Sequence, residues 1–211
     1  MKKKIWISVG FLLAFVLWTY AVSSVGVQPI GPKNSCVGFA AVNGSVRDFF
    51  GVHFSMYHLT DWLGLVPVAF GMGFAVLGLI QWIKRKHVLR VDRSLWALGV
   101  FYILVIAAYL FFESHAVNFR PVLIEGRLEA SYPSSTTLLT LCVMPTAWMQ
   151  LRRRMRAGVG RKVVCCLITA FTVFMVVGRL LSGVHWLTDI IGGVLLSAGL
   201  VVLYDAFVGR K

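Results

Sequence analysis

Long uncharged stretches alternate with short, strongly charged segments along this chain. A helix that crosses the hydrocarbon core of a bilayer needs about 20 mostly apolar residues. Because backbone groups in lipid must find hydrogen-bond partners within their own segment, each such stretch is expected to be helical. The pattern predicts an all-α membrane protein with six transmembrane helices, at residues 5–27, 62–83, 94–112, 133–151, 163–181 and 186–207.

The loop between the first and second spans has a mixed pattern of its own. Residues 43–61 interleave aromatic side chains with polar ones, which is typical of a helix that lies flat on a membrane surface. We expect a short interfacial helix here, and an ordered loop is the alternative. Since the chain shows no repeat, low-complexity tract or linker, we expect a single domain over residues 1–211.

The start of the chain also resembles a secretory signal peptide, because three lysines precede the first apolar run. That run continues without a charge to Pro32, whereas the apolar core of a signal peptide has only about 7–15 residues. A transmembrane helix is therefore the better interpretation of this segment.

Composition agrees with a membrane protein and excludes an ordinary soluble domain. Hydrophobic residues make up 58% of the chain, charged residues only 14%, and the mean hydropathy is +0.80. The formal net charge of +13 could attract anionic lipid head groups. Nucleic acid is not expected as a partner, because no soluble basic domain accompanies this charge.

Most of the positive charge marks one side of the membrane. Of the 21 Lys and Arg residues, 16 lie at 2–4, 84–93, 152–162 and 210–211. All of these segments fall on the same side of a six-span chain, and an excess of Lys and Arg is the mark of cytoplasmic loops. We therefore expect a multi-pass protein of the plasma (inner) membrane with both termini in the cytoplasm.

The sequence GRLLSGVHWLTDII, residues 178–191, places three ionisable groups where the fifth span ends and the sixth begins. His185 and Asp189 are four residues apart, so they share one face of the starting helix. A carboxylate that binds one imidazole nitrogen leaves the other free as a nucleophile or base. Arg179 adds a planar guanidinium suited to phosphate oxygens. The alternative is structural: a polar pair, with an arginine that reaches to the interface.

Two further segments on the same outer side carry polar groups. Arg120 precedes a proline, which holds a second guanidinium in a rigid turn. Ser134, Ser135 and Thr136 follow Pro133 at the expected start of the fourth span, where free N–H groups and the helix dipole favour an anion. Ser134 as a simple N-cap is the alternative interpretation.

With these three segments the chain resembles the type 2 phosphatidic acid phosphatase superfamily of integral membrane lipid phosphatases. The signature of that family reads Lys-x6-Arg-Pro, then Pro-Ser-Gly-His, then Ser-Arg-x5-His-x3-Asp. Seven positions match in order: Arg120, Pro121, Pro133, Ser134, Arg179, His185 and Asp189. Four positions differ, with Glu113 in place of Lys, Ser135 of Gly, Thr136 of His and Gly178 of Ser.

The resemblance implies a phosphoric monoester or diphosphate hydrolase that works through a phosphohistidine. His185 would be the nucleophile and Asp189 its orienting partner, while Arg120, Arg179 and Ser134 would hold the phosphate, with Ser135 and Thr136 beside it. Neither a metal nor another cofactor is expected, since the arginines and the helix start supply positive charge. The substrate would be a membrane lipid phosphate or a polyprenyl diphosphate, cleaved at the extracytoplasmic face.

The general acid is not where the family has it, because Thr136 replaces the second histidine. His115 and Glu113 on the same outer segment are candidates for this role. A diphosphate substrate would need little protonation, since a leaving phosphate has a pKa of about 6. The other interpretations are a lipid-phosphate-binding pseudoenzyme and, less favoured, a transporter, whose polar site would lie near the midplane.

Overall fold

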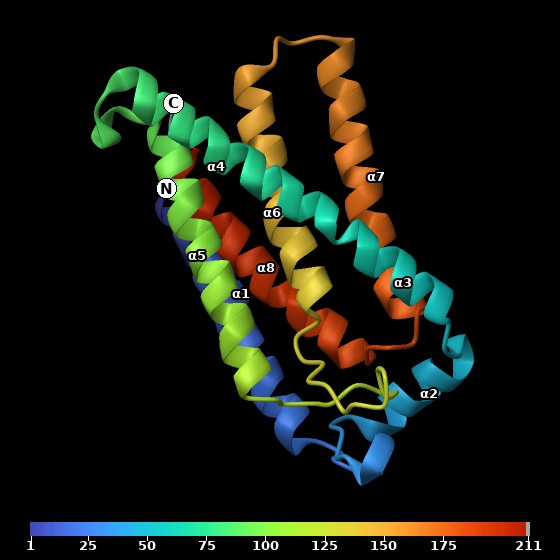
Figure 1. Cartoon of the computed structure of the whole chain (residues 1–211). Coiled ribbons are helices and arrows are strands. Elements are labelled where there is room, and N and C mark those ends of the chain that lie inside the picture. The colour runs from blue at the N-terminus through green and yellow to red at the C-terminus, as the bar shows by residue number, and fades with distance from the viewer. Residues whose placement is uncertain (210–211) are drawn as a thin grey trace.

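A computed structural model describes residues 1–209 of the chain, and this part contains helices and no strand (Figure 1). Arg210 and Lys211, which belong to the last cation cluster, lie outside the described residues. The α-helices are α1 (Lys2–Ser24), α2 (Ala40–Phe50), α3 (Phe54–Leu63), α4 (Leu65–Arg85), α5 (Arg93–Ser114), α6 (Ser135–Arg154), α7 (Val159–Leu181) and α8 (Leu187–Val208).

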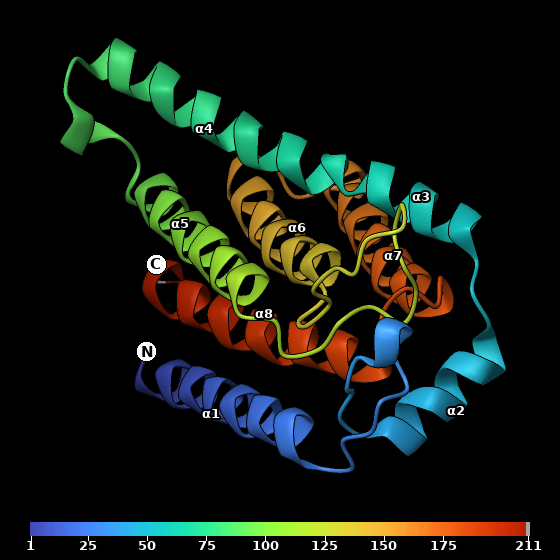
Figure 2. The same cartoon turned by 60° about the horizontal axis from the view of Figure 1, so that its bottom comes forward.

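Five helices of the described chain are long and apolar enough to cross a membrane: α1, the combined α3–α4 helix Phe54–Arg85, α5, α7 and α8. They correspond to five of the six predicted spans. The remaining one, α6, has 20 residues but is more polar, because it begins with hydroxyl side chains and ends in three arginines. In Figures 1 and 2, α6 nevertheless runs between α4, α7 and α8.

We expected one interfacial helix over residues 43–61, and the structure divides this segment. Two helices occupy this segment, and they are separated at Gly51, whose φ of 73° ends α2. α3 runs almost directly into α4, with only Gly64 between them, so it extends the second span instead of lying apart from it. The apolar pattern alone did not reveal the break, because aromatic side chains continue on both sides of Gly51.

Helix α8 forms the centre of the bundle and packs against α1, α5 and α6 (Figure 2). Glycine lets α8 approach α1 closely, since a Cβ atom at Gly199 would lie 2.7 Å from a methyl carbon of Leu12 on α1. The hydroxyl of Ser8 donates to the carbonyl of Gly199 at 2.8 Å. Small residues and interhelical hydrogen bonds are the usual means of helix packing in membranes.

The cation-rich segments within residues 1–209 lie at the same end of the bundle. The chain start, the turn between α4 and α5, the turn between α6 and α7, and the end of α8 gather there, opposite the loops that carry the predicted site (Figure 1). Acidic side chains pair with some of these cations: Lys4 lies 2.6 Å from Asp205, and Arg85 and Arg154 lie 3.0 and 3.7 Å from Asp92. The fold thus separates the basic end from the candidate site.

Candidate active site

His185 lies in the turn between α7 and α8, and the segment between α2 and α3 packs against this turn. Gly183 has a φ of 66°, and a Cβ atom there would lie 2.0 Å from the carbonyl oxygen of Gly51. The amide of His53 donates to the carbonyl of Ser182 at 2.9 Å. Only glycine fits at position 183, because the backbone conformation is left-handed and the neighbouring chain leaves no room.

Asp189 is fully buried at the start of α8, and both of its oxygens are fixed. Oδ2 accepts from the amide of Trp186 at 2.9 Å, and Oδ1 accepts from the side chain of Asn118 at 3.3 Å. The Asp189 carbonyl accepts from the amide of Ser134 at 3.1 Å, which ties the start of α6 to α8. Oδ2 lies 3.7 Å from Nδ1 of His185, near it but beyond hydrogen-bond distance.

The opposite side of the imidazole faces Arg179, which is 1% exposed. Nε2 of His185 lies 3.3 Å from one terminal nitrogen of the guanidinium. The other terminal nitrogen lies 3.4 Å from the hydroxyl of Thr60 and 3.7 Å from the carboxylate of Asp61. The guanidinium also lies over the ring of Tyr57, 5.0 Å from its centroid. α3 therefore contacts the guanidinium through three side chains.

The surroundings of His185 favour the neutral imidazole. Burial, and then the positive charges of Arg120 and Arg179, lower its pKa well below the ordinary value. We assign the proton to Nδ1, which faces a carboxylate, so that the lone pair of Nε2 can accept from Arg179. A neutral imidazole in this tautomer has its nucleophilic nitrogen directed at the guanidinium.

Arg120 approaches from the long loop between α5 and α6 and is 8% exposed. Its Nε lies 3.1 Å from a carboxylate oxygen of Glu129, and its amide donates to the Glu129 carbonyl at 3.0 Å. The guanidinium carbon lies 5.8 Å from the centroid of Tyr57, the ring that Arg179 also contacts. The indole of Trp186 donates to the carbonyl of Phe119 at 2.7 Å and so fixes the loop beside Arg120.

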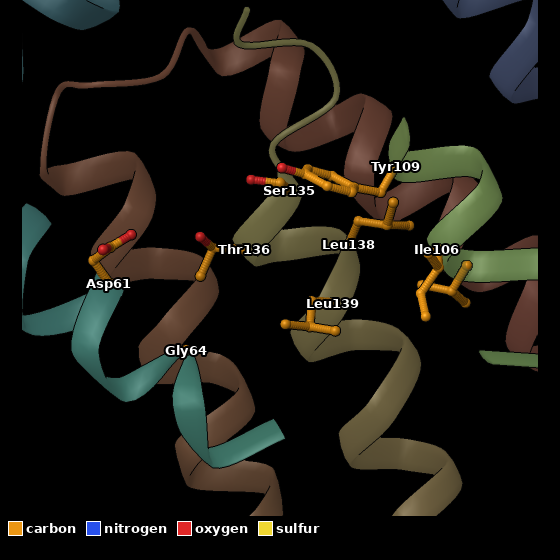
Figure 3. A pocket seen from close by; sticks show the side chains of 9 residues that line it. Asp61, Gly64, Ile106, Tyr109, Ser135, Thr136, Leu138 and Leu139 are labelled. Carbon is orange, nitrogen blue, oxygen red and sulfur yellow. The ribbon is translucent and has the colours of Figure 1, made fainter. Parts of the chain in front are cut away.

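The predicted start of the fourth helix is close to the observed one, since α6 begins at Ser135 and Ser134 is its N-cap residue. The Ser134 hydroxyl is buried and makes no hydrogen bond, so it does not act as the simple side-chain cap considered as the alternative. Ser135 and Thr136 are half-buried and line a cavity of about 270 Å³, with Asp61 on the wall formed by α3 (Figure 3).

The structure separates the two candidate acids. Glu113 lines a small cavity of about 10 Å³ together with His185 and Ser135. His115 lines a different cavity, and its Nδ1 lies 2.9 Å from the Ser114 hydroxyl. Its ring stacks on Phe111 with a centroid distance of 4.7 Å. Glu113 thus shares a cavity with the imidazole, whereas the cavity that His115 lines does not include His185.

Sequence reasoning did not identify the contribution of α3. Tyr57, Thr60 and Asp61 follow a spacing of three and four residues, which places them on one helix face, and all three contact Arg179. This spacing is the feature of the sequence that could have indicated a shared role for the three side chains. Asn118, which donates a hydrogen bond to Asp189, lies two residues before Arg120, and no pattern in the sequence indicates this contact.

The same packing accounts for Gly178, one of the four departures from the signature. A Cβ atom at Gly178 would lie 2.8 Å from the methyl group of Thr60. A serine at this position would need α3 and α7 to move apart. Within residues 1–209, no group of three or more His, Cys, Asp and Glu side chains is arranged to hold a metal ion.

Comparisons with known proteins agree with the predicted family. Residues 108–211 match the PAP2 superfamily, and this region contains the three signature segments. The chain is similar over its length to the crystal structure of a transmembrane PAP2-type phosphatidylglycerolphosphate phosphatase from Bacillus subtilis, with 19% identity, a TM-score of 0.54 and 96% of each chain covered. At this identity the likeness shows a shared fold. No curated protein sequence matches the chain.

Proposed function

We propose, from the membership of this chain in the PAP2 superfamily, that it is a lipid phosphatase that uses His185 as its nucleophile. The family and the apolar helices support a multi-pass membrane phosphatase. One observation carries the finer assignment: the buried imidazole has a guanidinium 3.3 Å from Nε2 and a carboxylate 3.7 Å from Nδ1. This is the surrounding that a nucleophile for phosphoryl transfer requires.

The reaction begins when the substrate phosphate displaces Arg179 from the lone pair of Nε2. Nε2 then attacks phosphorus, the bond from phosphorus to the lipid oxygen breaks, and its electron pair leaves with that oxygen. Arg120, Arg179 and the start of α6 stabilise the charge on the phosphoryl oxygens. The carboxylate of Asp189 stabilises the positive charge that the phosphohistidine carries.

Glu113 is the proton donor in this proposal, because it shares a cavity with His185 and His115 does not. Its carboxylic acid gives a proton to the leaving lipid oxygen. In the second half of the reaction its carboxylate takes a proton from the attacking water, which breaks the Nε2–phosphorus bond and releases phosphate. Two guanidinium groups supply the positive charge of the site, so these steps need no metal.

We place the chain in the plasma (inner) membrane with six spans, counting α6 as the fourth. At 1.5 Å per residue its 20 residues reach about 30 Å, the thickness of the hydrocarbon core. The basic end of the bundle would face the cytoplasm, and the site would face outside. α2 would rest on the outer leaflet, with Phe49, 82% exposed, toward the lipid.

Cysteine labelling tests this topology. Single cysteines at Arg127 and Ala157, both exposed and at opposite ends of the bundle, should react with an impermeant reagent from outside and from inside respectively. Asn118, another position on the outer side, is unsuitable because it is 1% exposed and binds Asp189. The opposite labelling pattern contradicts the proposed orientation.

Phosphate release by the purified protein tests the function. With a lipid monophosphate as substrate, His185→Asn should lower turnover at least about a thousandfold, since loss of a nucleophile removes the reaction path. His87→Asn is the matched control, because His87 is exposed at the opposite end of the bundle. Near-normal turnover by His185→Asn contradicts the nucleophile, and no turnover by the parent on any lipid phosphate contradicts the enzyme.

A further inference from the structure

A cavity of about 270 Å³ lies between α3, α5 and α6, and it shares Ser135 and Leu138 with the small cavity that His185 lines. Its floor is apolar, with side chains of Val105, Ile106, Leu138 and Leu139. Its upper part is polar: Figure 3 shows the carboxylate of Asp61 on the α3 wall, with the hydroxyls of Ser135 and Thr136 on α6. The Asp61 side chain is 58% exposed, so the carboxylate is accessible to a ligand.

One guanidinium connects this carboxylate with the attacking nitrogen. A terminal nitrogen of Arg179 lies 3.3 Å from Nε2 of His185, and the other lies 3.7 Å from Oδ1 of Asp61. A phosphoryl group held by Arg179 therefore has the imidazole on one side and Asp61 close by. In an in-line displacement the leaving group departs opposite the nucleophile.

The cavity is the space that suits the lipid part of the substrate. Its apolar residues lie one or more turns inside α5 and α6, toward the middle of the spans, as an acyl or prenyl chain requires. Its polar end, which Asp61 lines, is next to the phosphate position. The first atoms of the leaving group beyond the scissile bond would thus lie within reach of a carboxylate.

We infer that Asp61 selects the leaving group: the site favours lipid monophosphates with a hydroxyl or ammonium group next to the phosphate ester, and it disfavours lipid diphosphates. This inference rests on the proposed phosphatase function and deepens it. A carboxylate accepts hydrogen bonds from a hydroxyl or an amine. It repels the second phosphate of a diphosphate, because like charges at short range repel each other.

A purely structural role for Asp61 predicts a different result. If the carboxylate only held Arg179 in place, its loss would slow all substrates by the same factor. The guanidinium has other partners that do this, the hydroxyl of Thr60 at 3.4 Å and the ring of Tyr57. The 3.7 Å distance to Asp61 exceeds that of a hydrogen bond, so its carboxylate keeps acceptor capacity for a ligand.

The test compares three lipids of similar chain length on the purified full chain: a monoacylglycerol phosphate, an alkyl monophosphate without a hydroxyl, and an alkyl diphosphate. The parent should cleave them in that order of kcat/KM. Asp61→Asn should lower the ratio of kcat/KM for the monoacylglycerol phosphate to kcat/KM for the alkyl diphosphate by about tenfold, the effect of removing one nearby charge. Asp61→Glu, which keeps the charge, should retain the order.

Asp48→Asn is the matched control, because Asp48 is an exposed carboxylate on α2 at the same end of the bundle. It should leave the ratio unchanged. An equal loss on all three lipids in Asp61→Asn, or a parent that prefers the diphosphate, overturns the inference while leaving the phosphatase intact.

A binding measurement tests the selection by Asp61 independently of whether the protein is a phosphatase. In a His185→Asn background, displacement of a fluorescent lipid phosphate by the same three lipids reports affinity without turnover. Tighter binding of the monoacylglycerol phosphate, lost on adding Asp61→Asn, supports the selection even if no lipid is cleaved. Equal affinities for the three lipids overturn it. Thermal unfolding of each variant shows whether the fold is retained.

Discussion

Replacing Arg179 with lysine tests whether this side chain recognises the phosphoryl group or only anchors the end of α7. The guanidinium reaches two partners at once, Nε2 of His185 at 3.3 Å and the hydroxyl of Thr60 at 3.4 Å. It does so while stacked on the ring of Tyr57. A lysine would keep the positive charge but has a single nitrogen in place of a planar fork.

The expected loss follows from the geometry. Two terminal nitrogens can donate to two phosphoryl oxygens in the transition state, and a lysine nitrogen in the same space keeps about one of these bonds. A hydrogen bond to a charged group contributes about 1.5–3 kcal/mol. The variant Arg179→Lys should therefore lose roughly tenfold to a hundredfold in kcat/KM.

The assay is the release of inorganic phosphate from a lipid monophosphate by parent and variant proteins. Arg127→Lys is the matched control, since Arg127 is exposed on the loop between α5 and α6, and it should retain parental kinetics. If Arg179→Lys also stays within twofold of the parent, the arginine does not bind the transition state. Equal unfolding temperatures of the variant and the parent would exclude loss of fold as the cause.

Three further predictions concern the protonation state of His185, the identity of the proton donor and the packing of α3 against α7. Because burial and two arginines lower the pKa of His185 in the free protein, its neutral form persists as pH falls, so the acid limb of kcat/KM should lie below the pKa of free imidazole; a limb at or above that pKa contradicts the neutral site. Glu113→Gln should lower monophosphate turnover about 10²–10⁴-fold and His115→Ala should not; the reverse result would exchange their roles. Gly178→Ser should lower the free energy of unfolding by about 1–3 kcal/mol, and Thr60→Ala should relieve much of this loss; thermal unfolding of the single and double variants measures both.

The sequence was sufficient for five of the predicted apolar helices and for the proximity of Arg179, His185 and Asp189. Apolar stretches of about 20 residues have few alternatives to a helix in lipid. His185 and Asp189 are close in sequence, so their proximity follows from helix geometry alone. Arg179 precedes His185 by six residues, so a tight turn between α7 and α8 is enough to bring the two side chains together. Gly183 provides this turn.

Long-range contacts could not be predicted from local pattern. Arg179 meets Thr60 and Asp61 across more than a hundred residues, and no periodicity encodes that pairing. The break at Gly51 was also missed, because a glycine between aromatic residues fits both a flexible helix and a turn. The carbonyl of Gly51 lies close enough to Gly183 to exclude a side chain there, and this approach between two distant loops has no signal in the local sequence.

Two of the departures from the phosphatase signature fall where α3 adjoins the site, and this gives them a common physical reason. Gly178 removes a side chain where Thr60 packs, so α3 can approach α7 closely enough for Asp61 to lie 3.7 Å from Arg179. Thr136 replaces a histidine on the cavity that Asp61 also lines. A smaller side chain at each position leaves room for α3 and for a ligand. The signature is therefore altered where α3 places the Asp61 carboxylate, and combined variants of Gly178, Thr136 and Asp61 test these positions together.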